Sequence, residues 1–102
     1  MDVDKLLKTN NEMLIRFCKK HNITRLSLFG STLRGGVTDK SDIDLLVEFD
    51  PQHVPGLITL AGIEIELSQM LGKKVDLRTA QDLSAYFRDE VLNEAKEQYA
   101  KA

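Results

Sequence analysis

Residues 42–49 read Asp42-Ile43-Asp44-Leu45-Leu46-Val47-Glu48-Phe49, and this stretch decides how the chain folds. Its odd-numbered positions are all apolar, whereas its even-numbered positions begin with two carboxylates. Because successive side chains of a strand point to opposite faces of a sheet, the alternation predicts a strand with one buried apolar face. The other face then presents Asp42 and Asp44 on the same side, roughly 6.6 Å apart along the strand.

The segments around this strand predict an alternation of helices and strands. Helical spacing of apolar residues predicts a helix over 4–21, and the capping side chains at Thr9-Asn10-Asn11 allow a break within it. The other predicted elements are a strand over 24–29, a loop over 30–41, a helix over 57–71, a strand over 74–78, and a helix from the N-cap Thr79 to about Tyr99, with an interruption allowed near Phe87-Arg88. This order predicts an α/β fold in which helices pack on a small sheet.

Length and composition restrict the class of protein. A chain of 102 residues, 42% hydrophobic and 29% charged, is predicted to form one globular domain over residues 1–102. The net charge of −2 and the lack of a basic stripe argue against binding along nucleic acid. The longest apolar runs are far too short for a membrane span, and the start of the chain does not resemble a secretory signal. With its single cysteine, the chain is expected in the cytoplasm.

A phosphate-binding loop is the first candidate for chemistry. Gly30-Ser31 directly follows a predicted strand. The glycine lets the backbone come close to a ligand, and Ser31 can begin a helical turn whose free N–H groups and hydroxyl face an anion. Arg34 can return to the same end and offer a bidentate contact to a phosphate. A tight turn at Gly30-Ser31 and an ion pair of Arg34 with an acid such as Asp39 are the structural alternatives.

A carboxylate cluster is the second candidate. Asp42 and Asp44 can converge on metal ions, and Asp76, on the polar side of the predicted strand over 74–78, is a candidate third ligand. Each like-charge contact at ~4 Å costs about 4 kcal/mol at an effective dielectric constant near 20, so the cluster favours a cation site, with Mg²⁺ the natural guest. Alternatively, Asp42 ends a loop, and Asp76 forms a surface ion pair with Lys74 or Arg78.

Three residues of types often used in active sites are left out of this one. His21 is predicted to end a helix, where a cation suits the helix dipole, and His53 lies in a loop without a second ligand. Cys18, at helical spacing from Leu14, is predicted to lie in the core. A stripe of Leu92, Ala95 and Tyr99 is predicted to pack on the domain itself, with docking of a partner as the alternative.

The pattern Gly-Ser, ten residues, then Asp-x-Asp resembles the nucleotidyltransferase fold of the DNA polymerase beta superfamily, and most of all the minimal nucleotidyltransferases. The resemblance rests on residues 28–35 (LFGSTLRG), 41–47 (SDIDLLV), 74–77 (KVDL) and 86–92 (YFRDEVL). It implies a small mixed β-sheet packed against helices. The family often has an acidic residue where this chain has Gly36, which leaves the metal-binding acids unchanged.

The resemblance also implies residue roles and an activity. Gly30 and Ser31 would hold the triphosphate of ATP, Asp42 and Asp44 would bind two Mg²⁺ ions, and Asp76 would bind the catalytic ion and help to deprotonate the attacking hydroxyl. Short members of this family resemble antitoxins of HEPN-domain ribonuclease toxins, and some transfer AMP to a tyrosine of the toxin.

Three functions are therefore in competition. The first is Mg²⁺-dependent adenylylation of a HEPN toxin, in a homodimer or a hetero-oligomer. The second is neutralisation of the toxin by direct binding with weak or no catalysis. The third is nucleotidyl transfer to a small molecule such as an antibiotic, for which this short chain lacks an acceptor-binding domain.

Overall fold

The computed structural model describes residues 3–30, 42–83, 85–86 and 88–101. Its elements, in chain order, are the helices α1 (Val3–Thr9) and α2 (Asn11–Lys20), the strands β1 (Ile23–Leu28) and β2 (Ile43–Phe49), the helix α4 (Leu57–Leu71), the strand β3 (Val75–Arg78), the short 3-10 helix η1 (Ala80–Asp82), the helix α5 (Arg88–Glu94) and the strand β4 (Lys96–Ala100). The predicted first helix is thus present as two helices, which meet at Asn10.

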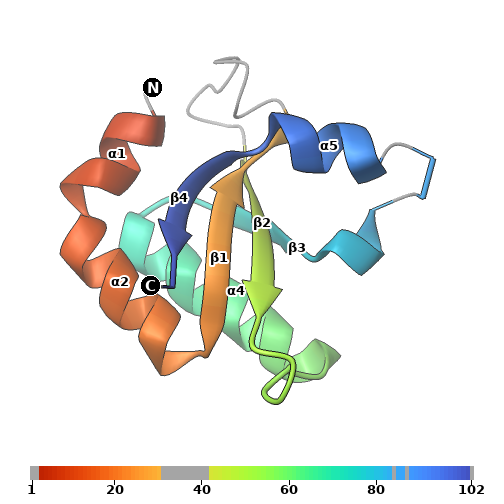
Figure 1. The fold of residues 1–102 in the computed structure, drawn as a ribbon. Coiled ribbons are helices and arrows are strands. Elements are labelled where there is room, and N and C mark those ends of the chain that lie inside the picture. The colour runs from red at the N-terminus through yellow and green to blue at the C-terminus, as the bar shows by residue number, and fades with distance from the viewer. Residues whose placement is uncertain (1–2, 31–41, 84, 87, 102) are drawn as a thin grey trace.

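The four strands form one mixed sheet in the order β3-β2-β1-β4 (Figure 1). β1 pairs antiparallel with β2 and with β4, whereas β2 pairs parallel with β3. The parallel pair needs a crossover, which α4 supplies between β2 and β3. The predicted α/β class with a small mixed sheet is confirmed.

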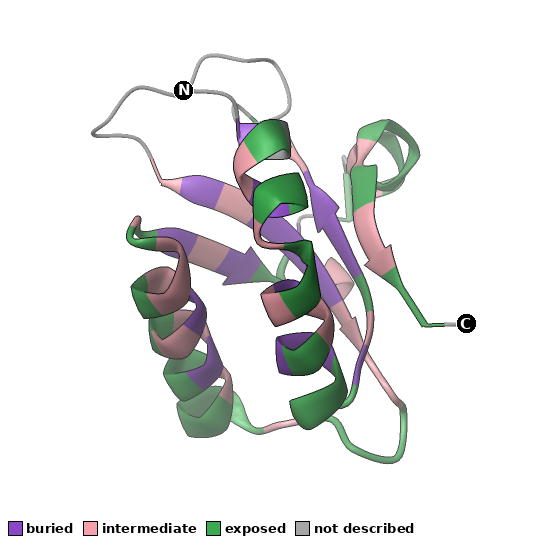
Figure 2. Ribbon diagram, turned by 90° about the vertical axis from the view of Figure 1, so that its left-hand side faces the viewer, coloured by how far each residue is buried: buried purple, intermediate pink, exposed green. Residues whose placement is uncertain are grey.

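The core lies between this sheet and the helices α1, α2 and α4. Ile43, Leu45 and Val47 of β2 are at most 1% exposed, as the alternation of the strand predicts. Leu26 of β1 and Leu67 of α4 are fully buried in the same cluster. Figure 2 shows α2 and α4 on this side of the sheet and α5 on the other. The apolar face of β2 therefore faces the helices, and its polar face points away from them.

The last predicted helix, from Thr79 to about Tyr99, is present in part as η1 and α5, and the prediction is wrong at its end, where the chain forms β4. Thr79 does cap a helix, because its backbone N–H donates to Asp82 Oδ2 at 3.0 Å, but that helix ends at Asp82. Residues 96–100 form β4, in which Tyr99 lies opposite Leu26 of β1. Backbone pairing with β1, together with packing of Tyr99 on the core, outweighs the local helical preference of this segment.

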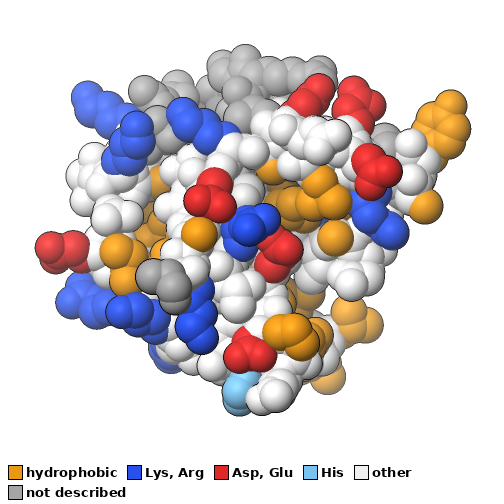
Figure 3. Space-filling model, viewed as in Figure 1, with side chains coloured by type: hydrophobic (Ala, Val, Ile, Leu, Met, Phe, Trp, Pro, Cys, Tyr) orange, Lys and Arg blue, Asp and Glu red, His pale blue; other side chains and the backbone are white. Residues whose placement is uncertain are grey.

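An ion-pair bridge supports β4 on the polar face of the sheet. Arg25 of β1 lies 3.3 Å from Glu97 of β4 and 3.5 Å from Glu48 of β2. Figure 3 shows this face, on which acidic and basic side chains lie side by side. The predicted stripe of Leu92, Ala95 and Tyr99 does not lie on one helix, because Leu92 is in α5 and Tyr99 is in β4. Leu92 is 41% exposed.

A second cluster of charges joins α2 to α4. Lys20 Nζ donates to Glu66 Oε1 at 3.0 Å, and His21 Nε2 lies 2.9 Å from Glu66 Oε2. His21 caps the end of α2, as predicted. The hydrogen bonds from His21 and then from Lys20 lower the pKa of Glu66 below its ordinary value.

Glu66→Gln should make the protein less stable at neutral pH but not in acid. A carboxylate with a lowered pKa in the folded state adds stability that is complete above the unfolded value of about 4.3 and fades as the pH falls further. Thermal denaturation of both proteins across this range measures the effect. The expectation is contradicted if the difference between the two melting temperatures stays constant with pH.

None of the described helices is both long enough and apolar enough to cross a membrane. The longest of them, α4, has 15 residues.

Candidate active site

The register of β2 and β3 brings two of the predicted carboxylates together. In this parallel pair Asp44 lies directly opposite Asp76, and the two side chains share the face that points away from α2 and α4. The backbone N–H of Ile43 donates to the carbonyl oxygen of Lys74 at 2.9 Å, which continues the ladder to the start of β2. Asp42 immediately precedes this strand. All three acids therefore lie at one end of the β2–β3 pair.

Gly30 lies close to the carboxylate of Asp44. Its φ of +64° is in the left-handed region, and a Cβ at this position would lie 3.0 Å from Asp44 Oδ2. The backbone N–H of Phe29 donates to the carbonyl oxygen of Asp44 at 3.2 Å, so the end of β1 is held beside this residue. Only glycine satisfies both the backbone angle and the close contact. The predicted loop thus begins next to Asp44.

Ser31 and Arg34 lie outside the described residues, in the segment 31–41. Their predicted contacts with phosphate therefore remain predictions.

Cationic side chains among the described residues contact two of the carboxylates. Arg78 Nε donates to Asp76 Oδ1 at 3.1 Å, and Lys74 Nζ lies 3.8 Å from Asp42 Oδ2. The hydrogen bond and the charge of Asp76 raise the pKa of Arg78. The pair of Arg78 with Asp76 is the surface ion pair that the sequence offered as the alternative for Asp76, whereas the contact of Lys74 with Asp42 was not among the alternatives. Among the described residues, no group of three His, Cys, Asp or Glu side chains is arranged to hold a metal ion.

These ion pairs are weak restraints on the acids. The Lys74 side chain is 77% exposed and that of Arg78 is 50% exposed. Exposed pairs of this kind contribute about 0–1 kcal/mol, since water competes for both partners. The acids can therefore exchange these cations for another positive ligand without unfolding the strand pair.

By their chemistry, though not by their arrangement in this structure, the three acids suit Mg²⁺. Asp42, Asp44 and Asp76 offer hard carboxylate oxygens from adjacent backbone positions, and Mg²⁺ is bound in proteins by one or two carboxylates together with substrate phosphates. Gly30, which has no side chain, lets the backbone lie close to the Asp44 carboxylate. The same three acids are the predicted metal ligands.

Sequence reasoning did not find two residues that position β3. Ser68 Oγ accepts a hydrogen bond from the backbone N–H of Val75 at 2.9 Å, and Glu64 Oε2 accepts one from that of Leu77 at 2.8 Å. These α4 side chains bind the backbone on both sides of Asp76, along the outer edge of the sheet. Their spacing of four residues places both on one face of α4, which is the signal that could have indicated them.

The side chains that were left out of the site do lie elsewhere. His21 contacts Glu66, and His53 Nδ1 lies 3.5 Å from Asp50 Oδ2, beyond the opposite end of β2. Cys18 is fully buried, and burial raises its pKa to about 12, so its thiol stays protonated.

A family model described as a nucleotidyltransferase domain matches residues 11–97, and the chain therefore belongs to the nucleotidyltransferase family. Within this class of enzymes, it has the fold of the minimal nucleotidyltransferases. A solved structure of a candidate minimal nucleotidyltransferase superimposes with a TM-score of 0.74 at 34% identity, covering 93% of this chain and 94% of that one.

Curated relatives carry more specific names. A protein of Methanocaldococcus jannaschii whose name marks it as a candidate protein adenylyltransferase is 39% identical over 82 residues, which cover 80% of this chain and 86% of the relative. Protein adenylyltransferase MntA of Thermococcus cleftensis is 32% identical over 76 residues, covering 74% of this chain and 75% of the relative.

A more distant structure shares the fold alone. It is a complex of a tri-AMPylated HEPN toxin of Shewanella oneidensis with an MNT antitoxin, and it superimposes with a TM-score of 0.67 at 20% identity, covering 93% of this chain and 73% of that one.

Proposed function

We propose that this chain is a Mg²⁺-dependent protein adenylyltransferase that transfers AMP from ATP to a tyrosine hydroxyl of a HEPN ribonuclease toxin, and so acts as the antitoxin. The observation that carries the proposal is the register of β2 and β3, which sets Asp44 beside Asp76 with Gly30 against Asp44. The names of the curated relatives support protein adenylylation, and the toxin–antitoxin complex supports a HEPN partner.

Each residue has a role in the proposed reaction. Gly30 and Ser31 would hold the triphosphate, Asp42 and Asp44 would bind two Mg²⁺ ions, and Asp76 would bind the catalytic one of these ions. Bound Mg²⁺ supplies positive charge for the phosphates and lowers the pKa of the attacking hydroxyl. Asp76 helps to withdraw the proton from that hydroxyl. The oxygen of the tyrosine hydroxyl then bonds to the α-phosphorus. The bond between the α- and β-phosphates breaks, so pyrophosphate leaves in line.

Transfer of label tests this function. The protein is incubated with ATP labelled at the α-phosphate, Mg²⁺ and a HEPN-domain toxin from the same organism. Label is expected on the HEPN protein and not when Asp42→Asn and Asp44→Asn are combined. Absence of transfer by the wild type, or equal transfer by the double variant, would overturn the proposal.

Asp76→Asn separates the third metal ligand from a surface ion pair. Loss of the Asp76 carboxylate should lower the rate of transfer, though less than loss of Asp44, because Asp76 is proposed to bind only one of the two ions. Arg78→Gln is the matched control, since it breaks the same ion pair but keeps the carboxylate. Initial rates of label transfer measure both. Equal losses in the two variants would mean that only the ion pair matters.

A specific surface favours the second candidate function, direct binding of the toxin. Val54, Leu57 and Ile58, at and before the start of α4, are 65%, 83% and 90% exposed. Three neighbouring aliphatic side chains in water form the kind of surface that partners cover. If contact alone neutralises the toxin, the variant lacking Asp42 and Asp44 should still protect cells, whereas Leu57→Ser with Ile58→Ser should not. If catalysis is required, the variant without the two acids fails.

A further inference from the structure

Tyr86 is displayed at the tip of a turn. Ala85 and Tyr86 lie between η1 and α5, and the Tyr86 side chain is 97% exposed. Aromatic side chains usually bury a large area. Because Tyr86 is almost completely exposed, packing on the core does not explain a tyrosine at this position. The connection between η1 and α5 stands at the edge of the molecule, away from the strands (Figure 1). The phenol of Tyr86 is therefore accessible to a second molecule.

Contacts at the base of the turn keep it in this position. Leu83, at the end of η1, is 8% exposed and anchors one side. Arg88, the first residue of α5, donates from Nη2 to the carbonyl oxygen of Leu83 at 3.1 Å, which ties the two sides together. Both sides of the turn are therefore held to the domain, with Tyr86 between them.

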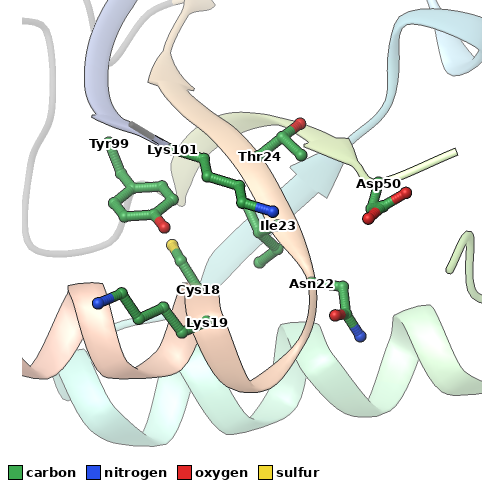
Figure 4. A pocket seen from close by; sticks show the side chains of 8 residues that line it. All are labelled: Cys18, Lys19, Asn22, Ile23, Thr24, Asp50, Tyr99 and Lys101. Carbon is green, nitrogen blue, oxygen red and sulfur yellow. The ribbon is translucent and has the colours of Figure 1, made fainter. Parts of the chain in front are cut away.

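Tyr99, the other of the two tyrosines in the sequence, is in a different environment. It lies opposite Leu26 in the sheet and packs against the core. Figure 4 shows its hydroxyl directed toward Cys18 in a pocket at the end of α2. Burial raises the pKa of Tyr99, which makes its phenolate harder to form. The chain thus offers one displayed and one sheltered phenol.

We infer, resting on the proposed function, that Tyr86 is itself an acceptor of the adenylyl group, and that it is modified in trans by the active site of a second copy of this chain. Oη of Tyr86 loses its proton to a carboxylate of that site and bonds to the α-phosphorus of ATP. The bond between the α- and β-phosphates breaks, and pyrophosphate carries away the electron pair. The product is a phosphodiester on Tyr86, and no oxidant or reductant is needed.

Intact-mass spectrometry of the full-length protein tests this inference. After incubation with ATP and Mg²⁺ alone, the wild type should gain the mass of one adenylyl group, and peptide fragmentation should assign it to Tyr86. Tyr86→Phe should gain none, and the matched variant Tyr99→Phe should gain as much as the wild type. Modification of Tyr86→Phe to the level of the wild type would overturn the inference.

Mixing two variants distinguishes transfer in trans from transfer within one chain. Tyr86→Phe supplies an intact site without the acceptor, and the combined Asp42→Asn and Asp44→Asn variant supplies Tyr86 without a working site. Adenylylation of the second variant in the mixture is expected. Its absence, when the wild type alone is modified, would overturn the transfer in trans.

The toxin assay separates this inference from the proposed function. Tyr86→Phe should still label the HEPN protein at the rate of the wild type. A wild type that labels the HEPN protein but never itself would overturn the inference alone. A wild type that labels neither protein would overturn the proposed function together with it.

Discussion

Asp44→Asn is expected to reduce nucleotidyl transfer by about 10²-fold or more, the order found when one preorganised electrostatic contact is removed from an active site. Asp44 is the acid at the centre of the site, since Asp76 lies opposite it across the strand pair and Gly30 contacts its carboxylate. Asparagine has nearly the same shape but carries no charge for a cation. Initial rates of label transfer at saturating ATP and Mg²⁺ measure the loss.

The same substitution should leave the fold unharmed or slightly more stable. Directly opposed like charges on neighbouring strands destabilise a sheet, and such pairs are worth about 0.2–1 kcal/mol. Removing the charge of Asp44 relieves its repulsion with Asp76, so the melting temperature without Mg²⁺ should not fall. A gain or no change in stability together with a large loss of activity is the pattern of a functional residue.

Asp50→Asn is the matched control for this experiment. Asp50 follows the other end of β2, where its carboxylate accepts a hydrogen bond from the backbone N–H of Gln52 at 2.9 Å. That bond is the main reason why the pKa of Asp50 is lowered. Its loss should leave transfer unchanged. Equal activity of Asp44→Asn and Asp50→Asn would remove Asp44 from the active site.

Gly30→Ala is expected to lower the rate of transfer about tenfold or more. Alanine in the left-handed region costs about 1–2 kcal/mol, and its Cβ would lie 3.0 Å from Asp44 Oδ2, so the carboxylate must move. A displacement of about 1 Å in an active site can cost about 10²-fold in rate, and a smaller shift is needed here. Rates of label transfer and thermal denaturation are the two measurements.

Gly72→Ala provides the control because it imposes the same backbone strain away from the site. Gly72 ends α4 with a φ of +69°, close to the +64° of Gly30, and a Cβ there would meet nothing within 4 Å. Both variants should lose similar stability. Only Gly30→Ala should lose activity beyond what that destabilisation causes, and a matching loss in Gly72→Ala would attribute the effect to strain alone.

Most of the fold was predictable because its elements carry local signals. The alternation in residues 43–49 predicted both the strand and its buried face, and Gly72 marked the end of α4 through its left-handed backbone. The last strand was not predictable in this way. Residues 96–100 have no alternation of apolar and polar side chains, and they become a strand only because β1 offers them an edge.

The residues of the candidate site also differ in how far the sequence alone could identify them. Asp42 and Asp44 were recognisable because their spacing along one strand already brings them to one face. Asp76 was recognisable only as a candidate, since its distance from Asp44 depends on the parallel pairing of β2 with β3. The backbone contacts of Glu64 and Ser68 with β3 depend on how α4 packs, and sequence reasoning did not find them.

By itself, the sequence determined the elements whose residues interact with near neighbours, the buried face of β2, and the residue types that suit phosphate and Mg²⁺. Only the tertiary structure decided that Asp44 lies beside Asp76, that Gly30 contacts Asp44, and that residues 96–100 form a strand. The physical reason is range. Helical and strand periodicity depend on residues a few positions apart, whereas register and edge pairing are selected by backbone hydrogen bonds and core packing between segments distant in the chain.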